Sequence, residues 1–224
     1  MAKKINVITL GCSKNLVDSE HLMAQLDEAG YELVTDSNST DAKIVVINTC
    51  GFIGDAKEES INMILEVCDL KRKRRVRKVF VMGCLSERYM AELGDEIPQV
   101  DKYYGKFDWV NLIKELKEDA QIEGCQLERI QTTPPHYAYV KIAEGCNHAC
   151  AYCVTPRIRG GHRSRPQVNI LKEVRHWVEQ GAKEINLIAQ DTTYYGKDLY
   201  GRFALVDLLK ELALELNQLE CHFC

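Results

Sequence analysis

Three cysteines stand close together in the stretch 144–153, Glu-Gly-Cys-Asn-His-Ala-Cys-Ala-Tyr-Cys. Cys146, Cys150 and Cys153, here called the loop cysteines, follow the spacing C-x3-C-x2-C, and Tyr152 directly precedes the third. Cysteine thiolates are the ligands of iron–sulfur clusters, and three of them can hold three irons of a 4Fe–4S cube and leave the fourth open. Because an open iron can bind and reduce a small molecule, the spacing predicts a redox cofactor.

Zinc is the alternative metal for this loop, because His148 lies among the cysteines. Structural zinc sites take tetrahedral ligands from separated pairs of residues. Cys146, His148, Cys150 and Cys153 are instead crowded on one loop, which favours a cluster. A coloured protein after anaerobic reconstitution, compared with a colourless zinc protein, would separate the two hypotheses.

A second set of cysteines, Cys12, Cys50 and Cys84, is spread over the first half of the chain, and we call it the strand-end cysteines. Each lies just after an apolar run typical of a buried parallel strand. In open α/β sheets the carboxyl ends of such strands open into one crevice, so we expect these thiols to meet as a second metal site. The alternative is that Cys50 and Cys84 are small buried residues. Cys68 falls on a helix face and Cys125 in a loop, where we expect core or incidental roles.

The elements that must position these thiols alternate between strand and helix. Cys84 is expected in a turn, Gly-Cys-Leu, before a short helix, and the helix over 56–70 is expected to bury Ile61, Ile64, Leu65 and Cys68. The alternation predicts an α/β domain over 1–118, an N-terminal open parallel sheet with flanking helices. Its predicted strands cover 5–10, 31–35, 43–48, 78–82 and 100–104, and its helices 16–29, 56–70 and 109–116.

The second half of the chain begins a new series of elements. A polar segment over 119–135, which ends in two prolines, predicts a linker. A strand, the cysteine loop, a helix, a strand and a helix then follow over 136–224, which is how a (βα) barrel begins. The predicted strands cover 137–143 and 183–190, and the predicted helices cover 168–180 and 203–217.

The composition is that of a globular protein, with 46% hydrophobic and 28% charged residues and a net charge of −4 over 224 residues. No apolar run approaches the length of a membrane span, and no signal-peptide region is evident, so we expect a cytoplasmic protein without membrane contact. Ten cysteines are many for this length. Secreted disulfide scaffolds are usually shorter, so we expect mostly metal ligands.

Two basic groups remain. The run Lys-Arg-Lys-Arg-Arg over 71–75, followed by Arg77 and Lys78, closes a predicted helix, where cations suit the helix dipole. A solvated helix end is the simpler interpretation of this run, and contact with RNA is the functional one. The second group follows the cysteine loop, where it could meet a cofactor carboxylate or an acidic substrate: Arg157, Arg159, Arg163 and Arg165.

With these motifs, the chain resembles the methylthiotransferase family of radical S-adenosylmethionine enzymes over nearly all of residues 4–217. It is most similar to the RimO group, which modifies an aspartate of a small-subunit ribosomal protein. Cys-Ser-Lys-Asn at 12–15 and Asp-Thr-Thr at 191–193 distinguish it from relatives that act on tRNA adenosine. The motifs that carry the resemblance lie at 9–20, 48–53, 56–60, 83–86, 146–153, 190–193 and 195–196.

The resemblance implies two 4Fe–4S clusters and S-adenosylmethionine as cofactors. The loop cysteines would hold the reducing cluster, and Tyr152 would lie over it or help seat the adenine, unless it is only a packing aromatic. The strand-end cysteines would hold an auxiliary cluster that presents sulfur. A 5′-deoxyadenosyl radical would take hydrogen from the aspartate β-carbon, a bond that acid–base chemistry cannot ionise near neutral pH. The carbon radical would then couple with methylated sulfur.

The resemblance also implies partners: the ribosomal protein substrate and a reductant protein such as flavodoxin or ferredoxin. Ribosomal RNA is the possible partner of the basic run over 71–78. The family's barrel needs more strands than this chain supplies, so we expect a C-terminally truncated, incomplete barrel that binds a cluster poorly and turns over little. Cys221 and Cys224 could form an extra metal site, but we expect them to belong to an altered end. Two alternatives stay open, a tRNA adenosine methylthiotransferase and an inactive truncated iron–sulfur protein.

Overall fold

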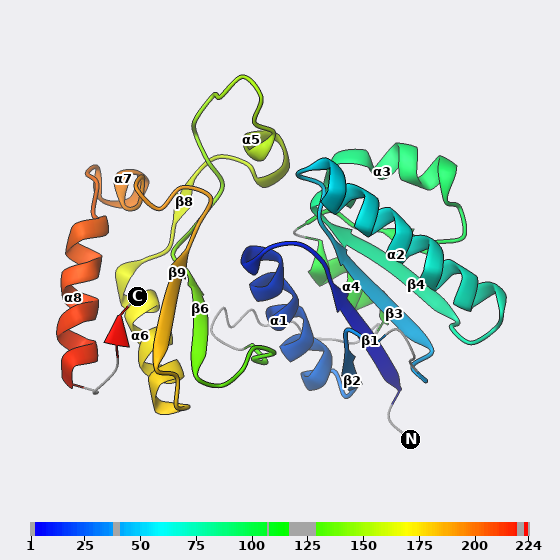
Figure 1. The fold of residues 1–224 in the computed structure, drawn as a ribbon, viewed down its shortest axis with the longest axis horizontal. Coiled ribbons are helices and arrows are strands. Elements are labelled where there is room, and N and C mark those ends of the chain that lie inside the picture. Colours follow the sequence, from blue (N-terminus) through cyan, green and yellow to red (C-terminus); the bar gives the residue numbers. More distant parts are fainter. Residues whose placement is uncertain (1–2, 38–40, 107, 117–128, 219–221, 224) are drawn as a thin grey trace. The chain divides into compact units, whose positions relative to one another are not determined.

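The computed structural model describes residues 3–37, 41–106, 108–116, 129–218 and 222–223 (Figure 1). The chain divides into two compact units, Met1–Ile130 and Gln131–Cys224, called unit 1 and unit 2. Most of the linker predicted over 119–135 falls outside the described residues, as do Cys125, Cys221 and Cys224. None of the described helices combines the length and apolar character that crossing a membrane requires.

Unit 1 is built on a five-stranded parallel sheet in the order β2-β1-β3-β4-β5. The neighbours β1, β3 and β4 pair in continuous register, from Ile5 opposite Ile44 to Thr49 opposite Gly83. The order therefore makes the turns after these three strands neighbours at one edge of the sheet. The elements of unit 1 are β1 (Lys4–Thr9), α1 (Ser13–Glu28), β2 (Glu32–Thr35), β3 (Ile44–Thr49), α2 (Gly54–Arg72), β4 (Lys78–Gly83), α3 (Cys84–Glu96), β5 (Lys102–Tyr103) and α4 (Trp109–Leu116).

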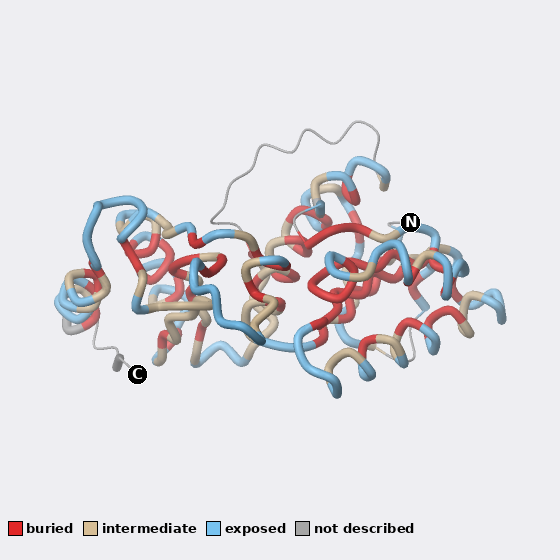
Figure 2. Tube along the Cα trace, turned by 90° about the horizontal axis from the view of Figure 1, so that it is seen from above, coloured by how far each residue is buried: buried red, intermediate tan, exposed pale blue. Residues whose placement is uncertain are grey.

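Helices cover both faces of this sheet. Strands β1, β3 and β4 are buried over nearly all of their length, and Figure 2 colours buried residues red. Successive strand residues point to opposite faces, which explains the continuous apolar runs. Val45 and Ile47 of β3 pack in one core with Ile64 of α2, whereas Val46 packs in the other core with Leu22 of α1. The predicted open parallel sheet with flanking helices is confirmed.

Two details of unit 1 differ from the predictions. Leu65 was expected on the buried face of its helix, but it is 48% exposed, because the stripe of α2 that meets the sheet runs through Ile64, Val67 and Cys68. Cys84 was expected in a turn before a short helix, but it is the first residue of α3, which extends to Glu96. No separate turn lies between β4 and α3, because Gly83 ends the strand with a φ of 101° and the helix begins at the next residue.

Unit 2 carries a three-stranded parallel sheet in the order β10-β9-β6, which is the start of a barrel. The two long helices pack on it, with Val140, Ile185, Trp177 and Leu208 in one core. A short antiparallel hairpin of β7 and β8 and the helices α5 and α7 were not predicted. The elements of unit 2 are β6 (Tyr137–Lys141), β7 (Ala143–Glu144), α5 (Thr155–Arg159), β8 (Arg163–Ser164), α6 (Gln167–Glu179), β9 (Glu184–Ile188), α7 (Lys197–Tyr200), α8 (Leu205–Gln218) and β10 (His222–Phe223).

Replacement of Gly83 tests the packing of the strand ends in unit 1. A Cβ at Gly83 would lie 2.4 Å from the Asn48 side-chain oxygen and 2.5 Å from the Thr49 carbonyl, on backbone with positive φ. We expect Gly83→Ala to lower the free energy of unfolding by roughly 2 kcal/mol or more. Gly94→Ala is the control, since a Cβ there meets nothing within 4 Å and the helix should gain ~0.5–1 kcal/mol. Equal stability of both variants by urea denaturation would contradict this packing.

Candidate functional site

The strand-end cysteines lie on three adjacent turns of unit 1. Cys12 directly precedes α1, Cys50 follows β3 and Cys84 begins α3. Cys12 is exposed, whereas Cys50 and Cys84 are buried, and all three are free thiols. Cys50 is fixed to α2, because its backbone N–H donates to the Ser60 hydroxyl at 3.0 Å and that hydroxyl donates back to the Cys50 carbonyl at 3.1 Å.

The buried side chain of Asn15 ties these turns together. Its amide nitrogen donates to the carbonyls of Leu10 and Thr49, both at 3.0 Å, so it joins the ends of β1 and β3. Its oxygen lies 3.7 Å from the sulfur of Cys84, which donates to it. One amide therefore contacts all three turns, because parallel strands deliver their carboxyl ends to one edge.

Two glycines let the same turns approach closely. A Cβ at Gly11 would lie 2.6 Å from the Cβ of Cys50 and 2.9 Å from its sulfur. A Cβ at Gly51 would lie 2.6 Å from the backbone of Leu85, next to Cys84. The segments that carry the three thiols are thus in van der Waals contact through positions where only hydrogen fits.

The loop cysteines lie on a segment of unit 2 that is closed at its base by the β7–β8 hairpin, with Glu144 opposite Arg163. Gly145 has a φ of 82°, and a Cβ there would lie 2.2 Å from the carbonyl oxygen of Gly161. The N–H of Cys146 donates to the carbonyl of Gly160 at 3.1 Å. The base of the loop is therefore held tightly, with its first thiol at the base.

A hydrogen-bonded group joins this base to the end of β9. Gln190 accepts from the Gly145 N–H at 2.8 Å and donates to the Glu144 carboxylate at 2.6 Å. The same carboxylate accepts from buried Arg159 at 3.2 Å and forms an ion pair with Lys141 at 3.0 Å. Arg159, which the sequence offered as a contact for cofactor or substrate, is therefore used to hold the loop.

His148 and Asp191 form a second connection between the loop and the segment after β9. A ring nitrogen of His148 lies 2.8 Å from the Asp191 carboxylate, and the His148 N–H donates to the sulfur of Cys146 at 3.4 Å. Burial acts to raise the pKa of Asp191, but hydrogen bonds from Thr193 and His148 outweigh it and hold the pKa below its usual range. Asp191 is thus a carboxylate that anchors the loop.

The three loop thiols differ in their surroundings. Cys146 is buried, Cys150 is exposed and Cys153 is half-buried. Cys153 lies 3.1 Å from the Thr155 hydroxyl, and hydrogen bonds from Thr155 hold the pKa of its thiol below the ordinary value. Tyr152 is 92% exposed, so its ring is no part of the described core and is open to a ligand.

The donor chemistry of both sets fits iron–sulfur clusters. All of the described cysteines are free, and each set supplies three thiols from one loop or one sheet edge. The thiolate, which is the metal-binding form, is favoured at Cys153. Among the described residues, Cys146, His148 and Asp191 form another candidate set for a single metal ion, because their ligand atoms lie within 4.8 Å of one another. This set differs from the cysteine-rich zinc site that the sequence suggested.

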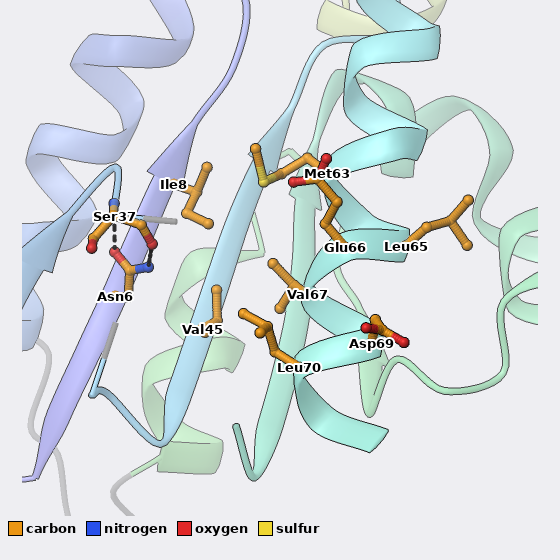
Figure 3. A pocket seen from close by; sticks show the side chains of 10 residues that line it. All are labelled: Asn6, Ile8, Ser37, Val45, Met63, Leu65, Glu66, Val67, Asp69 and Leu70. Carbon is orange, nitrogen blue, oxygen red and sulfur yellow. Dashed lines mark hydrogen bonds between the residues drawn. The ribbon is translucent and has the colours of Figure 1, made fainter. Parts of the chain in front are cut away.

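A pocket of about 470 Å³ runs beside α2 and over β1 and β3 (Figure 3). Its floor is apolar, with Ile8, Val45 and Met63, and Asn6 bonds to Ser37 at one side. None of the strand-end cysteines lines it. We therefore assign it no part in the metal chemistry.

Sequence reasoning placed the thiols but missed the residues that hold them. Asn15, Gln190 and Asp191 belong to motifs that the resemblance used, but the sequence analysis gave them no individual role. The signal that could have found them is position, because Asn15 follows the first strand and Gln190 and Asp191 follow β9 at its carboxyl end.

Two protein families match separate parts of the chain. Residues 4–105 match the uncharacterized protein family UPF0004, and residues 140–223 match the Radical SAM superfamily. The first match covers the sheet and strand-end cysteines of unit 1, and the second covers the loop cysteines, β9, β10 and the end of β6 in unit 2.

Curated relatives match nearly the whole chain. The ribosomal protein uS12 methylthiotransferase RimO of Bacteroides fragilis is 58% identical over 94% of this chain and 49% of its own length. The proteins of the same name from Bacteroides thetaiotaomicron and Flavobacterium johnsoniae are 56% and 53% identical, each over 94% of this chain and 48% of their own length. The chain thus spans about half the length of the curated relatives it matches.

Solved structures show the same fold at low identity. The radical S-adenosylmethionine methyltransferase TsrM from Kitasatospora setae matches 97% of this chain and 52% of its own, with a TM-score of 0.64 and 11% identity. The cobalamin-dependent S-adenosylmethionine radical enzyme OxsB matches 99% of this chain and 38% of its own, with a TM-score of 0.60 and 12% identity. The α/β fold class predicted from the sequence is confirmed.

Loss of the Asn15 amide should loosen the strand-end turns. In Asn15→Ala the buried carbonyls of Leu10 and Thr49 lose a donor, and we expect the free energy of unfolding to fall by roughly 2 kcal/mol or more. Asn62→Ala on the exposed side of α2 is the control and should stay within ~0.5 kcal/mol of the parent. Urea denaturation measures both, and an unchanged midpoint for Asn15→Ala would contradict the role of the amide.

The ligand set of the loop can be separated by substitution. After anaerobic reconstitution with iron and sulfide, we expect Cys150→Ser to lose most of the unit 2 chromophore, because one of three thiolates is gone. His148→Gln should keep it, as should Cys68→Ala, which removes a buried thiol of α2. Absorbance together with iron and sulfide content gives the answer. A chromophore kept in Cys150→Ser and lost in His148→Gln would instead favour the Cys146, His148 and Asp191 set.

Proposed function

Since the chain belongs to the methylthiotransferase family of radical S-adenosylmethionine enzymes, we propose that its function is to attach a methylthio group to the β-carbon of an aspartate in ribosomal protein uS12. The observation that carries the proposal is the presence of two sets of three free cysteines, each held by its own unit. The high identity to relatives named for this reaction supports the choice of substrate.

The two sets of thiols would hold different groups. Cys146, Cys150 and Cys153 would hold a 4Fe–4S cluster together with S-adenosylmethionine, and the strand-end cysteines would hold a second 4Fe–4S cluster. When bound, these groups supply hydrogen abstraction from an unactivated carbon and the sulfur to be transferred, which side chains alone cannot supply. The exposed ring of Tyr152 would contact S-adenosylmethionine.

The residues around the loop position its three thiols. Gln190 fixes the Gly145 amide at the base, and the His148–Asp191 contact fixes the segment between the first two thiols. Thr155 favours the thiolate of Cys153 before any metal arrives. Such supporting contacts reduce the reorganisation needed when a cofactor binds, in the way that outer-shell partners orient metal ligands.

The proposal includes two partners besides the substrate. Reductive chemistry needs an electron donor, and we infer a reductant protein such as flavodoxin or ferredoxin. The substrate is a component of the ribosome, so we place the reaction in the cytoplasm.

The function is tested with the anaerobically reconstituted protein, S-adenosylmethionine, a chemical reductant and purified uS12. Even at the low turnover expected from the sequence, some peptides of uS12 should gain the mass of one methylthio group in place of one hydrogen, on an aspartate. Cys146→Ser should abolish the gain, because the loop then lacks its buried ligand.

Purified transfer RNA is the competing substrate in a parallel reaction. Methylthio adenosine in digested tRNA, with uS12 unmodified, would overturn the choice of substrate. Release of no 5′-deoxyadenosine by a protein shown to carry both clusters would overturn the reaction itself and favour an inactive iron–sulfur protein.

A further inference from the structure

The end of the unit 1 sheet opposite the cysteine turns gathers positive charge. The carboxyl end of α2 and the starts of β1, β3 and β4 meet there (Figure 1). The N–H groups of Arg77 and Lys78 donate to the carbonyl of Lys43 at 2.8 and 3.0 Å, and the Lys43 ammonium donates to the carbonyl of Arg75 at 3.1 Å. Backbone pairing of β3 with β4 therefore brings these four cations together.

A groove of about 830 Å³ opens at this end of the sheet. Five cations and three carboxylates line it: Lys3, Lys4, Lys43, Arg77 and Lys78, with Glu32, Asp41 and Glu115. Each carboxylate already has a cation, since Lys4 lies 3.2 Å from Glu32 and 2.7 Å from Asp41, and Lys102 lies 2.7 Å from Glu115. In the described part of the chain Lys43, Arg77 and Lys78 form no ion pair, so the surplus charge of the groove is positive.

The positive surface extends beyond the groove along the turn after α2. Arg74 and Arg75 are exposed there, and Arg75 is joined to the groove through its bond with Lys43. Lys71, Arg72 and Lys73 by contrast have acidic partners in Asp101 and Asp69. In the described part of the chain, the cations without an ion pair thus form a row along the backbone from Arg74 to Lys78, which Lys43 joins through its bond to Arg75. Such a row suits a ligand with repeated negative charges rather than a single small anion.

The chemistry of the row favours phosphates of RNA over an acidic protein. Arginine binds phosphate oxygens through two parallel hydrogen bonds. Stable protein interfaces need apolar anchors, and none of the exposed large hydrophobic side chains of the described residues lines this groove. Proteins that bind unpaired bases stack them on exposed aromatic rings, and the described lining of the groove has no such ring. The RNA ligand that remains is a double-stranded one, bound through its phosphate backbone.

We propose that this row, made by Lys43, Arg74, Arg75, Arg77 and Lys78, binds the phosphate backbone of structured RNA without reading its sequence. The proposal depends on the charge of unit 1 and not on clusters or methylthio transfer, so it can fail or hold independently of the proposed function. The net charge of the whole chain is −4, so RNA binding at this face is a local property.

The test uses the full chain and a fluorescent RNA hairpin, with anisotropy measured over a series of salt concentrations. Arg75→Gln/Arg77→Gln removes two exposed cations but keeps the backbone bonds. At low salt we expect the affinity for the hairpin to fall roughly 10-fold or more. The slope of log affinity against log salt concentration should become shallower by about 2. Lys172→Gln/Lys210→Gln removes two exposed cations of unit 2 and should leave both values unchanged. A second hairpin of unrelated sequence should behave the same.

Protection of lysines from acetylation tests the same surface in the unaltered chain, whatever the folding of the variants. Added hairpin RNA should lower the acetylation of Lys43 and Lys78 several-fold and leave Lys172 and Lys210 unaffected, as read by mass spectrometry. The proposal would be overturned if RNA protected all four lysines equally, or if both double variants lowered the RNA affinity equally. It would also be overturned if the chain bound polyglutamate as tightly as RNA.

Discussion

The buried amide of Asn15 joins the turns on which the metal chemistry of unit 1 depends. It donates to carbonyls at the ends of β1 and β3, and it contacts the sulfur of Cys84 at the start of α3. A buried carbonyl without a donor is costly, so this geometry is strongly preferred over looser ones. Three thiols that are far apart in the sequence are thereby kept on adjacent, tightly packed turns.

Unit 2 keeps its three thiols together in another way. Its three thiols are close in sequence, so the fold needs to hold only one loop. The base is rigid, through Gly145 against Gly161 and through Gln190, whereas Cys150 and Tyr152 lie exposed further along. A fixed base with an accessible tip is suited to cofactor assembly, because thiols must be reachable when iron and sulfide arrive and well placed afterwards.

The two ends of the sheet in unit 1 have different chemical characters for one structural reason. Parallel strands deliver all their carboxyl ends to one edge and all their amino ends to the other. The sequence places cysteines after the strands and cations before them, as with Cys84 after β4 and Arg77 before it. Sulfur chemistry and electrostatic attraction are therefore separated by the length of the strands, and each can be altered without the other.

The sequence by itself determined the fold class and the long strands and helices, and it set the spacing of both sets of cysteines, because periodicity and spacing are local properties; the short elements β7, β8, α5 and α7 carry too few residues to show a period. Only the tertiary structure decided that buried Arg159 pairs with Glu144 and that Leu65 is exposed. It also paired His148 with Asp191, 43 residues away. Which distant groups meet depends on how strands pair and which stripe of a helix faces the sheet, and no short stretch of sequence contains that information.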